Sequence, residues 1–181
     1  MTAGRPRERV EVWFGDEARL GQKGTPTAVR ADRGTRPTAP EQGAFGHLHV
    51  LTAVGPATGE AEGLVGPALS ARVAQLFLDQ LSATAPAGTH RLRVWDGAGC
   101  HVAKARRVPA DLTLITLPPY PPESSPAERL WLYLRQHDWP GRVHPTLADL
   151  EAAAASGWRA TGLSAERIKT VCRCDYLEPG T

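Results

Sequence analysis

The chain has 181 residues, and its 21 lysines and arginines nearly balance its 19 aspartates and glutamates. This length predicts one domain with one sizeable core, and so mild a charge balance does not by itself indicate a nucleic-acid partner. No apolar run approaches the ~20 residues of a membrane span, which excludes a transmembrane protein. Cys100, Cys172 and Cys174 lack a Cys-x-x-Cys spacing, so we expect a soluble cytoplasmic protein without structural disulfides or zinc.

The chain begins with a polar segment followed by an alternating strand. Residues 1–9 are expected to be a disordered tail, and residues 10–16 alternate between apolar and polar side chains. Side chains in a strand point to opposite faces with a period of two. Val10 and Val12 therefore share a face with Asp16, and we expect this apolar face to be buried.

A long segment without apolar periodicity follows. Residues 18–44 are rich in Gly, Pro, Thr and Arg, which predicts a basic hairpin or arm. Residues 47–54 and 61–65 are expected to form two antiparallel strands, joined by the turn 55–59.

The second half of the chain alternates helices and strands. We expect helices over 70–85, 98–107, 125–137, 146–158 and 164–172, strands over 92–96 and 112–117, and a C-terminal tail over 176–181. This order of elements is that of a ribonuclease-H-like α/β domain, here over residues 10–175, with a mixed five-stranded sheet and flanking helices.

Three acidic residues stand where such elements begin or end. Asp16 and Asp96 each end an apolar strand, and Glu128 lies in the first turn of a predicted helix. Carboxylate oxygens are the ligands that Mg²⁺ and Mn²⁺ prefer, so converging acids could hold such ions for attack on a phosphodiester. Each acid also has a structural explanation. An aspartate at a strand end caps the next turn, and Glu128 could close a capping box with Ser125.

The residues around these acids resemble the DDE transposases of bacterial insertion sequences, in the superfamily that includes mariner elements. The similar segments are Trp-Phe-Gly-Asp16-Glu-Ala-Arg, Val-Trp-Asp96-Gly-Ala-Gly-Cys-His and Pro-Pro-Glu-Ser-Ser-Pro-Ala-Glu128-Arg-Leu-Trp. The resemblance implies that Asp16, Asp96 and Glu128 coordinate two Mg²⁺ or Mn²⁺ ions. It further implies metal-dependent DNA strand cleavage and strand transfer at insertion-sequence ends, by a homodimer bound to transposon ends and target DNA.

Basic residues flank the acids in two runs, one after Asp16 and one from Arg91 to Arg107. Such runs are commonly solvated surface, but next to a carboxylate cluster they also favour phosphate binding. His101 could likewise contact phosphate or pack on the surface. The expected DNA-binding residues are Arg19, Lys23, Arg30, Arg33, Arg36, His101 and Lys104.

Two other functions share part of this pattern. A host ribonuclease-H-like nuclease would use the same acids, and a non-catalytic DNA-binding or dimerising fragment would need only the fold and the basic arm. Only about nine residues precede the first strand, so we expect either a helix-turn-helix portion that is separate or joined by frameshifting, or a truncated copy of a longer transposase.

Overall fold

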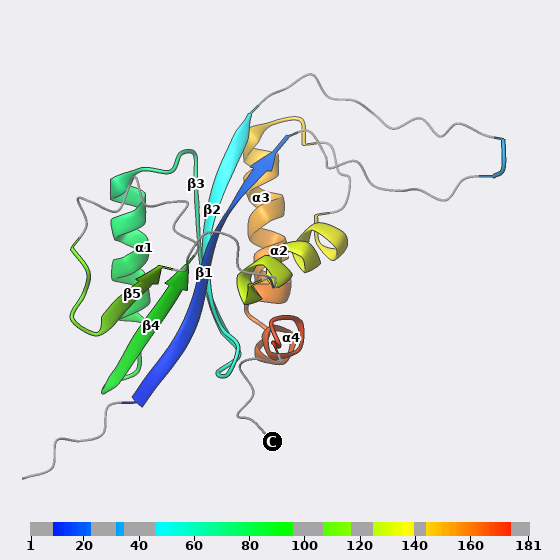
Figure 1. Cartoon of the computed structure of the whole chain (residues 1–181). Coiled ribbons are helices and arrows are strands. Elements are labelled where there is room, and N and C mark those ends of the chain that lie inside the picture. Colours follow the sequence, from blue (N-terminus) through cyan, green and yellow to red (C-terminus); the bar gives the residue numbers. More distant parts are fainter. Residues whose placement is uncertain are drawn as a thin grey trace, which may run out of the picture.

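A computed structural model describes residues 9–22, 32–34, 46–95, 107–116, 125–139 and 144–174. Within them lies a five-stranded sheet of order β3-β2-β1-β4-β5 (Figure 1). Its strands are β1 (Arg9–Gly21), β2 (His47–Gly55), β3 (Glu60–Gly66), β4 (Thr89–Trp95) and β5 (Leu112–Thr116). The β1–β2 and β2–β3 pairs are antiparallel, whereas β4 is parallel to β1 and to β5. The expected mixed five-stranded sheet is confirmed.

The helices also follow the sequence pattern. They are α1 (Ala71–Ala83), α2 (Pro126–His137), α3 (Leu147–Gly157) and α4 (Ala165–Val171). A π-helical turn, Trp158–Gly162, extends the chain beyond α3. Almost all of the helix expected over 98–107 lies outside the described residues.

Helices cover both faces of the sheet. Figure 1 shows α1 on one side and α2, α3 and α4 on the other. The side chains of Trp13, Leu51 and Ala53 pack with Phe77 and Leu81 of α1. On the opposite face, the core cluster comprises Phe14, Ala18, Leu20, Leu48, Val50, Val54 and Val94 of the sheet with Ala127, Leu130, Trp131, Leu134, Leu150, Ala154, Ile168 and Cys172.

β1 is longer than its sequence pattern predicts, and it joins two halves of the sheet. It pairs with β2 from Phe14↔Val54 to Gly21↔His47, and with β4 from Arg9↔Thr89 to Gly15↔Trp95. Phe14 and Gly15 are therefore the residues of β1 that pair on both sides. Residues 18–21, expected to begin the arm, instead continue the strand.

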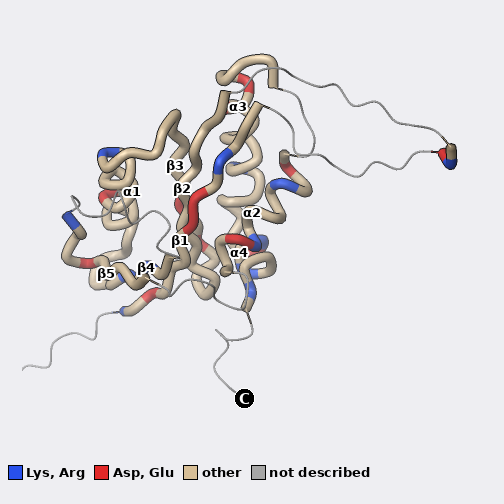
Figure 2. Tube along the Cα trace, turned by 45° about the horizontal axis from the view of Figure 1, so that its top comes forward, with Lys and Arg blue, Asp and Glu red and all other residues tan. Residues whose placement is uncertain are grey.

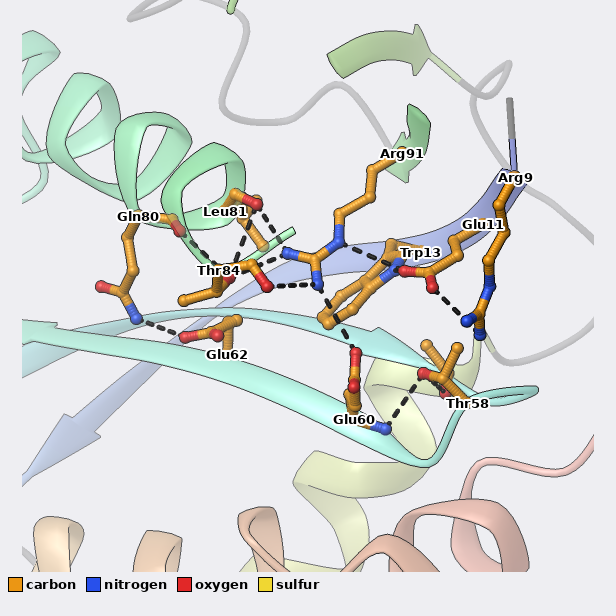
Figure 3. Close-up of polar contacts among 11 residues, drawn as sticks. Arg9, Glu11, Trp13, Thr58, Glu60, Glu62, Gln80, Leu81, Thr84 and Arg91 are labelled. Carbon is orange, nitrogen blue, oxygen red and sulfur yellow. Dashed lines mark hydrogen bonds and ion pairs between the residues drawn. The ribbon is translucent and has the colours of Figure 1, made fainter. Parts of the chain in front are cut away.

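The expectation that Val10 and Val12 lie on a buried face is wrong. Their side chains are 58% and 40% exposed, whereas Glu11 and Trp13 on the other face are buried. Glu11 and Trp13 are buried because they have a partner from β4: the Arg91 guanidinium lies over the Trp13 ring, with Cζ 4.1 Å from its centroid, and its Nε donates to Glu11 Oε2 at 3.3 Å (Figure 3). A paired carboxylate and guanidinium can be buried where isolated charges cannot.

Arg91 and Arg93 also correct the interpretation of the second basic run as a surface feature. Both side chains are only 2% exposed. They belong to the interior between the sheet and α1, and so they are not available to bind phosphate.

No helix in the described ranges is both long enough and apolar enough to cross a membrane.

Candidate active site

Asp16 lies within β1, so the expectation that it ends the strand is wrong: Ala18 and Leu20 continue the buried face and β1 runs on to Gly21. Asp16 is half-buried and stands opposite Thr52 of β2. Its Oδ1 accepts a hydrogen bond of 2.7 Å from the backbone N–H of Glu17. Because Phe14 and Ala18 of the same alternating set pack in the core beneath α2, Asp16 belongs to the α2 face of the sheet.

Asp96 lies outside the described residues, but the strand that leads to it does not. β4 ends at Trp95, which pairs in parallel with Gly15, the residue before Asp16. The Trp95 indole N–H donates to Thr116 Oγ1 at 3.1 Å, and the Arg93 guanidinium lies 5.0 Å from the centre of the Trp95 ring. The end of β4 therefore lies beside Gly15, the residue that precedes Asp16 in β1.

Glu128 lies in the first turn of α2, in a capping box. The Ser125 side chain accepts a hydrogen bond from the Glu128 backbone N–H at 3.2 Å, and Glu128 Oε2 accepts one from the Ser125 N–H at 3.3 Å. Pro126 occupies the start of the helix, where its missing N–H costs nothing. The structural explanation of Glu128 is therefore confirmed. It does not exclude a second role, because the box uses only Oε2.

The buried side of α2 brings Glu128 to the same face of the sheet as Asp16. Ala127, Leu130 and Leu134 are fully buried, and α2 packs on β1 and β2. Two hard carboxylate donors thus share one face, and the third predicted donor follows the end of a neighbouring strand. This donor set fits Mg²⁺ or Mn²⁺ by its chemistry. Among the described residues, no group of three or more His, Cys, Asp or Glu could hold a metal ion, and Asp96 is not one of those residues.

Glu17 lies on the opposite face of β1 and has a partner there. Its Oε1 lies 3.0 Å from His49 Nδ1 of β2, and the next residue on this face, Arg19, places Nη2 3.1 Å from His47 Nδ1. The two imidazole rings meet edge to face at 5.4 Å between centroids. These cross-strand pairs were not predicted from the sequence. The matching i, i+2 spacing of Glu17 with Arg19 and of His47 with His49 was the available signal.

Of the expected DNA-binding residues, the structure describes Arg19 and Arg33. Both are exposed. Acidic and basic residues lie close together along β1 (Figure 2). Arg19 follows Asp16 and Glu17 in this strand, and it lies on the face opposite Asp16. The remaining residues predicted to bind DNA lie outside the described ranges: Lys23, Arg30, Arg36, His101 and Lys104.

The family is shown by a sequence match across most of the domain. Residues 11–151 match the family model of the DDE superfamily endonucleases. The chain belongs to this family. A curated relative, the uncharacterized protein y4pE/y4sA of Sinorhizobium fredii (strain NBRC 101917 / NGR234), is 30% identical over 110 residues, which cover 61% of this chain and 82% of the relative.

Solved structures of the Mos1 mariner transposase share the fold. The Mos1 paired end complex with Mn matches with a TM-score of 0.64 and 15% identity, over 90% of this chain and 51% of that one. The complex with Mg matches with a TM-score of 0.61 and 16% identity, over 90% and 52%. The chain thus spans about half the length of these relatives. The ribonuclease-H-like fold expected from the order of elements is confirmed.

Proposed function

We propose that this chain is the catalytic domain of a transposase that cleaves DNA strands and transfers them at insertion-sequence ends. The observation that carries the proposal is the parallel register of Gly15 with Trp95, since it brings the segments that lead into Asp16 and Asp96 side by side. Glu128 enters from α2, on the face of the sheet that carries Asp16. Family membership supports the same chemistry.

In this proposal, Asp16, Asp96 and Glu128 hold two Mg²⁺ or Mn²⁺ ions. Bound ions would activate a water or a DNA 3′-hydroxyl and stabilise the leaving oxygen. Asp16 in β1 and Asp96, which follows β4 in the sequence, would hold the ions together with Glu128 of α2. The capping box holds the Glu128 carboxylate by Oε2 and leaves Oε1 outside the box. The Mos1 paired end complexes with Mn and with Mg support the choice of metal.

The partners in this proposal are transposon-end and target DNA, bound by a homodimer. Paired-end complexes of Mos1 support this arrangement. We propose phosphate contacts from Arg19, Lys23, Arg30, Arg33, Arg36, His101 and Lys104, a helix-turn-helix portion that is separate or joined by frameshifting, and a cytoplasmic location.

Nicking of supercoiled plasmid by the purified chain tests the proposal. We expect activity that requires Mg²⁺ or Mn²⁺ and falls by at least about a hundredfold in Asp16→Asn, Asp96→Asn and Glu128→Gln, because each change removes a metal-binding carboxylate. Glu17→Gln is the matched control, since Glu17 neighbours Asp16 but points to the other face. Activity that survives in all three variants, or is lost equally in Glu17→Gln, would refute these assignments. DNA binding without nicking in any metal would instead support the non-catalytic fragment.

The flanking DNA separates a transposase from a host nuclease of the same fold. We expect inverted repeats on both sides of the gene. Metal-dependent nicking by a chain whose gene lacks such repeats would favour a host ribonuclease-H-like nuclease.

A further inference from the structure

A groove lies at the start of β1, whereas Asp16 lies in the middle of this strand. It has a volume of about 630 Å³ and lies between the first residues of β1, the turn that joins β2 to β3, and the end of α4. Val10 and Val12 line it from the strand, Pro56 from the turn, Lys169 from α4, and Arg173 from just beyond α4. Neither Asp16 nor Glu128 takes part, so the groove is distinct from the candidate active site.

One wall of the groove is an open strand edge. Pairing of β1 with β2 begins only at Phe14↔Val54, so no described strand flanks residues 9–13 on that side. On its other side, Arg9 donates its backbone N–H to Gly88 O at 3.0 Å, at the start of the pairing with β4. Because backbone groups of successive strand residues point to alternate sides, the N–H and C=O groups of Val10 and Val12 point away from β4 and toward the open side. An unpaired edge of this kind is a template for another strand.

The side chains around this edge combine apolar surface with positive charge. Val10 and Val12 are exposed in spite of their apolar character. Arg9, Lys169 and Arg173 are exposed cations in the lining. The acid in the lining, Glu11, is already neutralised: its Oε2 accepts from Arg91 Nε and Trp13 Nε1, and its Oε1 lies 3.3 Å from Arg9 Nη2 (Figure 3). The groove therefore presents a net positive rim to an occupant.

We propose that this groove binds an extended acidic segment of a partner protein, which adds to β1 as a strand. Backbone hydrogen bonds to Val10 and Val12 would supply affinity, and apolar side chains of the segment would cover the two valines. Carboxylates of the segment would meet Lys169, so that charge selects acidic partners over basic ones. Strand addition explains the open edge, the exposed valines and the basic rim together.

A synthetic peptide of alternating valine and glutamate tests the proposal by fluorescence anisotropy with the full chain. We expect saturable binding that weakens by about tenfold or more in Val12→Lys and in Lys169→Glu, which remove the apolar contact and reverse the rim charge. Leu132→Lys is the matched control, because Leu132 is an exposed apolar residue of α2 outside the groove. Nicking should persist in Lys169→Glu, so that failure of this proposal and failure of the proposed function remain distinguishable.

Changes in the peptide test the strand geometry. N-methylation of alternate residues removes the donors needed for pairing, and we expect it to abolish binding, whereas a valine–lysine peptide should not bind. Binding unaffected by N-methylation, equal binding of the lysine peptide, or displacement by duplex DNA alone would overturn the proposal. The double variant Asp175→Asn/Glu178→Gln tests whether the chain's own acidic residues compete for the groove. Tighter peptide binding in this variant would overturn the proposal of a partner protein.

Discussion

The Arg91 side chain connects the sheet to α1, because it contacts Glu11 and Trp13 of β1 and Leu81 of α1. Besides Glu11, its guanidinium donates to Leu81 O at 2.6 Å and Thr84 Oγ1 at 2.8 Å. It therefore places a positive charge at the carboxyl end of α1, where the helix dipole favours one. Removing it would leave a buried carboxylate and unsatisfied helix carbonyls together.

We predict that Arg91→Met lowers the free energy of unfolding by about 3–5 kcal/mol, the usual cost of breaking a buried ion pair on one side. Urea denaturation followed by circular dichroism measures it. Arg72→Met, at an exposed position of α1, is the control and should change stability by less than about 0.5 kcal/mol. Glu11→Gln in the Arg91→Met background should recover part of the loss. Equal, small effects of both arginine changes would contradict this assignment.

Cys172 gives the protein a pH dependence at alkaline pH. The pKa of the Cys172 thiol is raised from 9.0 to about 12, mainly by burial and to a lesser extent by Cys174, while Arg129 opposes the shift. Because the folded pKa lies above the unfolded one, the neutral thiol stabilises the fold fully below pH 9 and this contribution is lost as pH rises toward 12.

We predict that the wild type loses about 1.4 kcal/mol of stability per pH unit above 9 through this group. Cys172→Ala should be less stable near neutral pH, because it leaves a cavity, but should have a flatter profile between pH 9 and 11. Urea unfolding across this range measures both slopes. Parallel profiles would show that Cys172 does not titrate as described.

At the scale of elements, α2 and α3 begin with the same device in different places. Ser125 and Glu128 form the capping box of α2, and Thr146 and Asp149 form that of α3. Only the first contains a residue of the candidate site. A change in the α3 box therefore tests helix stability alone, whereas the same change in the α2 box also tests the position of the candidate carboxylate Glu128.

We predict that Ser125→Ala and Thr146→Ala each cost about 1 kcal/mol of stability, through loss of the cap. Only Ser125→Ala should also raise the Mg²⁺ concentration needed for half-maximal nicking. The variant keeps the Ser125 N–H that donates to Glu128 Oε2, but loss of the hydroxyl that accepts from the Glu128 N–H loosens the first turn of α2, which positions this carboxylate. Thermal unfolding and metal titration of both variants give the comparison. An equal rise in the metal requirement for both would show a general effect of destabilisation.

The elements were predictable where apolar residues repeat, and less so where charge is buried. The sequence predicted the start of α2 because Ser125, Pro126 and Glu128 are adjacent in the chain. The extension of β1 was missed because Arg19 and Gly21 interrupt a pattern that Ala18 and Leu20 in fact continue on the buried face. Buried Arg91 was not predictable, since its partner Glu11 lies 80 positions away and composition does not reveal such pairs.

For the whole molecule, bound metal should stabilise the fold by mass action. We predict that Mg²⁺ or Mn²⁺ at a hundredfold excess over the dissociation constant raises stability by up to about 2.7 kcal/mol per site. The melting temperature with and without metal measures it, in the wild type and in Asp16→Asn. Glu17→Gln should keep the shift. An equal shift in Asp16→Asn would place the metal elsewhere.

The overlap at Phe14 and Gly15 bears on how the sheet can deform. Among the described residues, β1 pairs with β2 from Phe14 onward and with β4 up to Gly15. If the half of the sheet formed by β2 and β3 rotated against the half formed by β4 and β5, the axis of rotation would pass through these two residues. Atoms move less in such a rotation the closer they lie to its axis. Asp16 is the next residue. When the sheet twists, this carboxylate lies where the two halves move least relative to each other.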